Sequence, residues 1–184
     1  MTRWFEDIPV GEVFDLGSHT FTEAEIIRFG TRFDPQYFHL DADASAHTHF
    51  GGIIASGWHT ACVGHRHLVD ALDAESERIR AAGGKPGIAG PSPGVDHMTF
   101  KTPVRPGDTV HYALTIADKR ISKSKRGWGI LSERIEATNQ NGELVYRAEL
   151  AGFVMRRNYR PTLSARFGMW MATTPVLRHL IPKR

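Results

Sequence analysis

One carboxylate and one imidazole stand close together in the chain, Asp34 and His39, within the segment Phe-Asp-Pro-Gln-Tyr-Phe-His-Leu-Asp. A general base must be held near the proton that it accepts, and such a pair can hold one water molecule as a nucleophile. The small residues of 51–57 follow and lead into a predicted long helix. Free N–H groups at a helix N-terminus stabilise negative charge on an oxygen. These residue types would suit the addition or removal of water beside a thioester carbonyl.

The same residues also have a purely structural explanation. Asp34 would then cap a turn, His39 would be an exposed loop residue, and the glycines of 51–57 would only permit tight packing of helix against sheet. Other chemistries have less support. Ser56 lacks the strand–turn–helix sequence of a hydrolase nucleophile, and Cys62 has no sign of activation. The histidines show no His-Glu-x-x-His spacing, so we expect neither a metal nor another cofactor.

A short helix must position Asp34. Thr22 and Glu25 fit a capping box, in which each side chain satisfies a free backbone N–H of the other residue. Pro35 disfavours helical backbone at the residue before it. The helix is therefore predicted to stop at Asp34, with His39 in the loop or short turn beyond.

A second, longer helix is predicted from Ser56 or Gly57 to about Ala81, where Gly83-Gly84 ends it. Its first half should be buried and its second half solvated, since charged residues dominate after Asp70. One apolar stripe at helical spacing is expected to form its buried face: Trp58, Ala61, Cys62, His65, Leu68, Val69 and Leu72.

The remaining pattern is that of strands. Alternating or β-branched segments predict strands at 10–20, 95–102, 110–116, 128–138 and 144–155. Asn141-Gly142 between the last two is a strong hairpin signal. One long apolar helix followed by consecutive strands favours an α+β fold, with a mainly antiparallel sheet wrapped around that helix.

Bulk properties exclude several classes of protein. The 184 residues, 41% hydrophobic and 23% charged, are typical of one globular domain. No apolar run is long enough for a membrane span, and the N-terminus does not read as a signal peptide. The single Cys62 suits a reducing, cytoplasmic location. Net charge is only +3, and aromatics are not interleaved with the basic cluster 119–126, so we expect no nucleic-acid partner.

Three segments resemble the MaoC-like dehydratases, the family of (R)-specific enoyl-CoA hydratases with the hot-dog fold. They are Asp34 to His39, Ser56-Gly57, and Phe-Lys-Thr-Pro-Val-Arg-Pro-Gly-Asp at 100–108. The resemblance covers about residues 8–155 and implies a curved antiparallel sheet around one long central helix. It also implies catalytic roles for Asp34 and His39, a backbone oxyanion donor at Gly57, and a supporting role for Ser56.

The chain departs from the family pattern around the predicted catalytic pair. Phe33 stands where the family has glycine, Gln36 where it has asparagine, and Tyr37 where it has proline. We therefore expect aromatic side chains to shape the acyl pocket: Phe33, Tyr37, Phe38 and Trp58. The basic cluster 119–126 is either a solvated hairpin tip or a site for coenzyme A phosphates, which Lys123 and Lys125 would then contact.

The predicted function is a hydro-lyase that interconverts (R)-3-hydroxyacyl-CoA and trans-2-enoyl-CoA. The substrate would be an acyl-CoA or acyl-carrier-protein thioester. The alternatives are a hot-dog acyl-CoA thioesterase and a non-catalytic acyl-CoA-binding subunit. The resemblance implies a homodimer or a dimer of dimers. We expect a hot-dog domain over 1–156 and a basic C-terminal extension over 157–184 that packs on the body or on a partner subunit.

Overall fold

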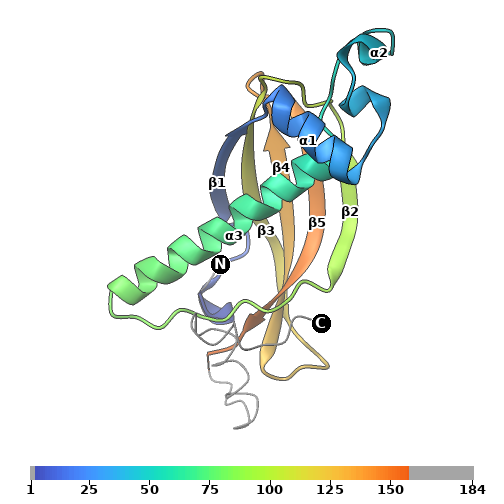
Figure 1. The fold of residues 1–184 in the computed structure, drawn as a ribbon. Helices are drawn as coiled ribbons and strands as arrows, with labels where there is room; N and C mark the ends of the chain where they lie inside the picture. The colour runs from blue at the N-terminus through green and yellow to red at the C-terminus, as the bar shows by residue number, and fades with distance from the viewer. Residues whose placement is uncertain (1–2, 158–184) are drawn as a thin grey trace, which may run out of the picture.

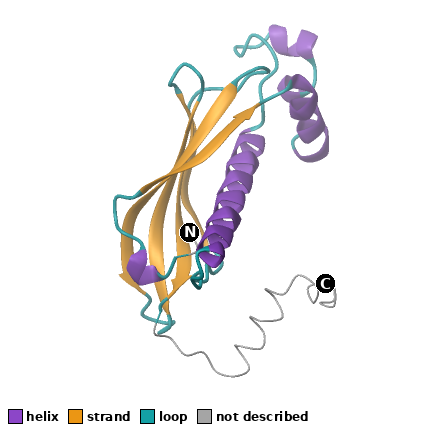
Figure 2. Ribbon diagram, turned by 90° about the vertical axis from the view of Figure 1, so that its left-hand side faces the viewer, coloured by secondary structure: helices purple, strands orange, loops and turns teal. Residues whose placement is uncertain are grey.

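The computed structural model describes residues 3–157, so the predicted C-terminal extension lies almost wholly outside the described residues. Five strands form one antiparallel sheet in the order β1-β3-β4-β5-β2, and a long helix, α3, crosses one face of it (Figures 1 and 2). The helices are α1 (Glu23–Phe33), α2 (Ala42–Ala46) and α3 (Gly57–Ala81), with short 3-10 turns at Phe5–Asp7 and Tyr37–His39. The strands are β1 (Val13–Thr20), β2 (Gly94–Phe100), β3 (Thr109–Ile121), β4 (Trp128–Thr138) and β5 (Leu144–Met155).

The inner strand β3, between β1 and β4, shows why the sheet has one apolar face. Its alternate residues Val110, Tyr112, Leu114 and Ile116 are all fully buried, as the period of two predicts. The hairpin between β4 and β5 is also confirmed, with Gly142 at φ +78° and its N–H bonded to the Asn139 carbonyl. These strands and the long helix make up the predicted hot-dog architecture.

Helix α3 approaches the sheet closely because it carries a small residue at the contact. A Cβ added at Gly64 would lie 2.7 Å from the Tyr112 ring, so only glycine permits this packing. The Tyr112 hydroxyl donates to the Thr60 carbonyl at 3.0 Å. This pair of contacts fixes the first half of α3 over the centre of the sheet.

The predicted buried stripe of α3 is wrong in part. Ala61 and Leu68 are buried, but Trp58 is 60% exposed, Val69 is 39% exposed, and Cys62 is also exposed. On the side toward β2, Trp58, Cys62 and Val69 line a cavity together with Met98 of that strand. The helix crosses the sheet obliquely, so a narrow line of its residues touches the strands (Figure 1). That line includes a histidine the stripe omitted, His59.

Candidate active site

Helix α1 ends where the sequence predicts and delivers Asp34 to the N-terminus of α3. The Thr22 hydroxyl accepts from the Glu25 N–H, and Asp34 is the C-cap residue, with its own N–H bonded to the Gly30 carbonyl. A Cβ added at Gly30 would lie 2.9 Å from Leu40 and 3.0 Å from the Cβ of His39. The glycine therefore lets the segment after Asp34 fold back against α1, where His39 sits in the turn Tyr37–His39.

Two donors hold the carboxylate of Asp34. The Ser56 hydroxyl donates to Oδ2 at 2.7 Å, and the Gln36 amide donates to Oδ1 at 2.8 Å. The Ser56 hydrogen bond, with a smaller contribution from the Gln36 amide, holds the pKa of Asp34 below its usual value despite partial burial. Asp34 is therefore ionised at neutral pH, the form that can accept a proton.

The imidazole of His39 is buried and oriented by the backbone. His39 is 4% exposed, which rules out the exposed-loop explanation, and its Nδ1 lies 2.7 Å from the Ile54 carbonyl oxygen. A carbonyl only accepts, so Nδ1 carries the hydrogen. In the neutral ring Nε2 is then an acceptor, and it lies 3.3 Å from Oδ2 of Asp34. A water molecule placed beside both atoms could donate one O–H to each.

The N-terminus of α3 lies at the same place. Ser56 is the N-cap, and its Oγ accepts from the Trp58 N–H at 3.2 Å. Among the hydrogen bonds of residues 3–157, none occupies the N–H of Gly57. A Cβ at Gly57 would lie 2.7 Å from the Phe100 ring, so the glycine lets an aromatic side chain approach the helix end. The free N–H is a donor suited to an oxyanion.

These groups line one cavity of about 390 Å³. Asp34, His39 and Gly57 meet there, with Phe38 and Trp58 from the predicted acyl pocket. Sequence reasoning missed several lining residues: Gln36, Phe50, Ile54, Thr60 and Val145. The segment 100–104 also lines it, and that segment opens the family-like motif singled out in the sequence.

Four predicted binding residues do not reach this cavity. Phe33 and Tyr37 are 63% and 55% exposed and are not among its lining residues. Lys123 and Lys125 lie in the β3–β4 hairpin, at the opposite end of the sheet from α1 (Figure 1). The 13 residues of β3 separate the two ends by about 40 Å at the rise of an extended strand. Among residues 3–157, the cationic side chain that lines the cavity is instead Lys101.

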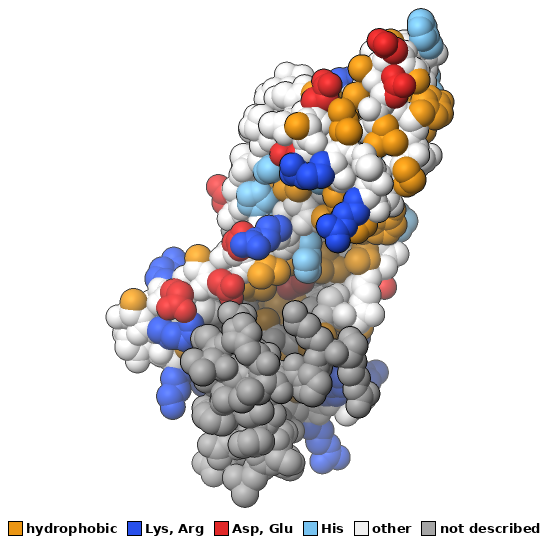
Figure 3. Space-filling model, viewed as in Figure 1, with side chains coloured by type: hydrophobic (Ala, Val, Ile, Leu, Met, Phe, Trp, Pro, Cys, Tyr) orange, Lys and Arg blue, Asp and Glu red, His pale blue; other side chains and the backbone are white. Residues whose placement is uncertain are grey.

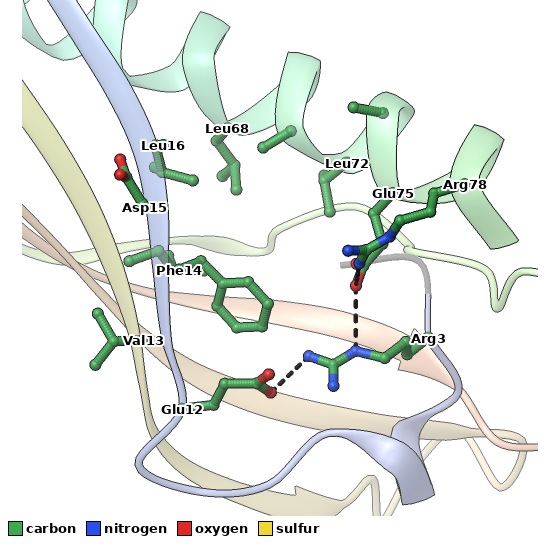
Figure 4. A pocket seen from close by; sticks show the side chains of 13 residues that line it. Arg3, Glu12, Val13, Phe14, Asp15, Leu16, Leu68, Leu72, Glu75 and Arg78 are labelled. Atoms are coloured by element: carbon green, nitrogen blue, oxygen red, sulfur yellow. Dashed lines mark hydrogen bonds and ion pairs between the residues drawn. The ribbon is translucent and has the colours of Figure 1, made fainter.

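A larger cavity, of about 600 Å³, lies between β1 and the second half of α3 (Figure 4). Four of its charged side chains pair with one another: Arg3 contacts Glu12 at 2.5 Å and Glu75 at 3.3 Å, and Arg78 contacts Glu75 at 3.4 Å. Neither Asp34 nor His39 lines this space. Its size alone therefore does not make it the reactive site.

Across residues 3–157, no three His, Cys, Asp or Glu side chains gather in a way that could hold a metal ion. No helix of that same part of the chain is long and apolar enough to cross a membrane. On the face shown in Figure 3, Lys and Arg side chains are interspersed with acidic and hydrophobic ones.

Comparison with known proteins agrees with the geometry. Residues 7–134 match the MaoC-like domain. The chain is 30% identical over 151 residues to the uncharacterized protein YdeM of Bacillus subtilis, covering 82% of this chain and 98% of that protein. It is also 30% identical over 124 residues to protein MaoC of Klebsiella aerogenes, covering 67% of this chain but only 33% of the Klebsiella protein.

Solved structures show the same fold. The MaoC-like dehydratase from Rhodospirillum rubrum is 34% identical, with a TM-score of 0.70 over 85% of this chain and 99% of that chain. The R-hydratase PhaJ1 from Pseudomonas aeruginosa is 19% identical, with a TM-score of 0.53 over 88% of this chain and 96% of that chain. The second likeness concerns the fold alone.

Proposed function

The chain belongs to the MaoC-like dehydratase family, and from that premise we propose that it interconverts (R)-3-hydroxyacyl and trans-2-enoyl thioesters of coenzyme A or an acyl-carrier protein. The observation that carries the proposal is the convergence of three groups on one cavity. They are the ionised Asp34, the acceptor Nε2 of His39 at 3.3 Å from it, and the N-terminus of α3 at Gly57.

In the hydration direction, Asp34 and His39 hold the attacking water. The water oxygen bonds to C3 of the enoyl chain as an O–H bond breaks and its proton passes to Asp34. The C2–C3 π electrons move toward the thioester carbonyl, and the Gly57 N–H stabilises the resulting enolate oxygen. The protonated carboxyl group then gives its proton to C2. Dehydration follows the same steps in reverse.

The proposal is tested by following loss of the enoyl group of crotonyl-CoA and of longer enoyl-CoA thioesters. We expect Asp34→Asn and His39→Gln each to lower kcat/KM by about a hundredfold or more, the range of a lost general acid–base residue. Asp43→Asn and His47→Gln change exposed residues of the neighbouring segment and serve as matched controls.

Three results would contradict the proposal. Release of free thiol without hydration, read with a thiol reagent, would indicate a thioesterase. Tight thioester binding with no product from any substrate would indicate a non-catalytic binding subunit. Hydration that survives in both Asp34→Asn and His39→Gln would show that the reaction uses other residues.

A further inference from the structure

A glutamate interrupts the apolar inner face of the sheet. On β4 the residues that face α3 include Leu131 and Ile135, which are 0% and 3% exposed, and Glu133 stands between them. Its neighbours across the sheet are Ile116 on β3 and Leu150 on β5. In the part of the chain that the structure describes, no hydrogen bond or ion pair reaches its carboxyl group. Glu133 is half-buried. A carboxyl group that loses part of its water without gaining a hydrogen-bond partner costs folding free energy, and such exceptions concentrate at functional positions.

The carboxyl group of Glu133 faces a cavity. A space of about 280 Å³ lies between α3 and β5, lined mostly by apolar residues and by three polar ones, Glu133, His65 and Ser92. Gly152 on β5 leaves room for the carboxyl group, since an added Cβ would lie 3.0 Å from Oε2. Burial raises the pKa of Glu133 to about 7. The group therefore can accept or donate a hydrogen bond near neutral pH.

This cavity and the cavity of the proposed active site each share lining residues with a space along α3. A second, strongly apolar space of about 470 Å³ lies between them, and Trp58 lines both it and the active-site cavity. At its other end, His65, Val69 and Leu150 line both it and the cavity of Glu133. From Gly57 to His65 the helix rises about 12 Å at 1.5 Å per residue. A thioester held at Gly57 could extend its acyl chain along this groove.

We propose that this groove binds the acyl chain of the substrate and that Glu133 selects chains carrying a hydroxyl group near their distal end. The inference rests on the proposed function, because it assigns the substrate class of that same site. A hydroxyl matches the carboxyl group as a hydrogen-bonding partner without adding a charge. A protonated amine would create a buried ion pair, whose desolvation cost can exceed its attraction.

The test compares chain pairs that differ only in the distal group. trans-2-Decenoyl-CoA and trans-2-dodecenoyl-CoA are each measured beside their ω-hydroxy counterparts, with crotonyl-CoA as the short reference. We expect the wild type to prefer one or both hydroxylated chains over the unsubstituted ones by tenfold or more in kcat/KM. A hydrogen bond to a charged group stabilises a complex by enough to produce a preference of that size. Glu133→Leu should reverse that preference, and Glu133→Gln should retain part of it. Glu149→Gln removes an exposed carboxylate on β5 and is the matched control.

Binding measurements separate selectivity for the acyl chain from effects on catalysis. Calorimetry of the same pairs on the inactive Asp34→Asn variant, with and without Glu133→Leu, should show the same reversal in Kd. Crotonyl-CoA hydration with no preference between paired chains would overturn this inference and leave the proposed function intact. A Glu133→Leu variant that differs only in stability or subunit association would also overturn it. If no thioester is hydrated and none of the paired chains is bound, both proposals fail.

Discussion

The hydroxyl of Ser56 serves the proposed active site and the long helix at once. It donates to Asp34 at 2.7 Å and accepts from the Trp58 N–H at 3.2 Å. Its bond to Asp34 is the largest single cause that holds down the pKa of that carboxyl group. One side chain therefore couples the protonation of Asp34 to the start of α3.

We expect Ser56→Ala to move the acid limb of the kcat/KM profile to higher pH. Without the hydroxyl the pKa of Asp34 rises toward its usual value, and the ionised base is lost at a higher pH as the solution is acidified. Loss of the N-cap should also lower stability by about 1 kcal/mol. Rate profiles and denaturant midpoints measure the two effects separately.

Ser76→Ala is the control for this variant, since Ser76 is another buried serine of α3 and has no bond to Asp34. It should leave the acid limb where it is. If the acid limb of the Ser56→Ala profile is also unshifted, the Ser56 hydroxyl does not control the pKa of Asp34.

At this scale the sequence predicts the reacting groups better than their partners. Asp34 and His39 are identifiable from type and spacing and Ser56 from the family resemblance, and the structure brings the three together. In the sequence Gln36 is notable only as a departure from the family pattern, yet its side-chain amide donates a hydrogen bond to Asp34. The acceptor that orients His39 is the backbone carbonyl of Ile54, 15 residues away. Every residue has a backbone carbonyl, so the amino-acid sequence does not reveal which of them accepts the hydrogen bond from His39.

At the scale of elements, the contact between Gly57 and Phe100 sets how α3 begins. Phe100 ends β2, and its ring would lie 2.7 Å from a Cβ at Gly57. Real Cβ atoms do not approach so closely, so Gly57→Ala must displace either the ring or the helix end. We expect kcat/KM to fall at least tenfold, because small displacements of a positioned donor are costly.

A second substitution, at Phe100, shows whether the methyl group of Gly57→Ala acts by crowding the Phe100 ring or in another way. The double variant Gly57→Ala/Phe100→Ala should regain activity relative to Gly57→Ala alone, as measured by crotonyl-CoA hydration. Gly94→Ala is the control, since a Cβ there meets nothing within 4 Å. An active Gly57→Ala enzyme would show that the helix end tolerates the shift.

The elements themselves were largely predictable. Capping at Thr22, the stop before Pro35 and the alternation of β3 are local signals. Helix α1 begins and ends close to the predicted residues, whereas β3 begins at Thr109 as expected but continues to Ile121, five residues beyond the predicted end. The short α2 was missed because its five residues have no apolar periodicity. The exposure of Trp58 and Val69 was missed because a helical stripe does not reveal the angle at which a helix crosses a sheet.

At the scale of the whole molecule, Glu133 should make stability depend on pH. Burial raises its pKa from 4.5 to about 7, so the native state binds more protons than the unfolded state between these values. The free energy of unfolding should therefore fall as pH rises through this window, by about 3 kcal/mol in total for this group. His59 opposes the trend, since burial lowers its pKa and favours the native state as pH rises toward 6.5.

Because Glu133 and His59 have opposite effects on the pH dependence of stability, the contribution of Glu133 is measured as a difference. That difference is between the unfolding free energies of the Glu133→Gln variant and the wild type. Glu133→Gln has no titrating carboxyl group, so its stability relative to the wild type should increase from pH 5 to pH 8, by up to the same ~3 kcal/mol. Urea unfolding at both pH values measures this difference. Glu149→Gln, on an exposed side chain of β5, should show no comparable gain. A constant difference across the range would mean that Glu133 is not desolvated in the folded protein, and the cavity it faces would then be open to water.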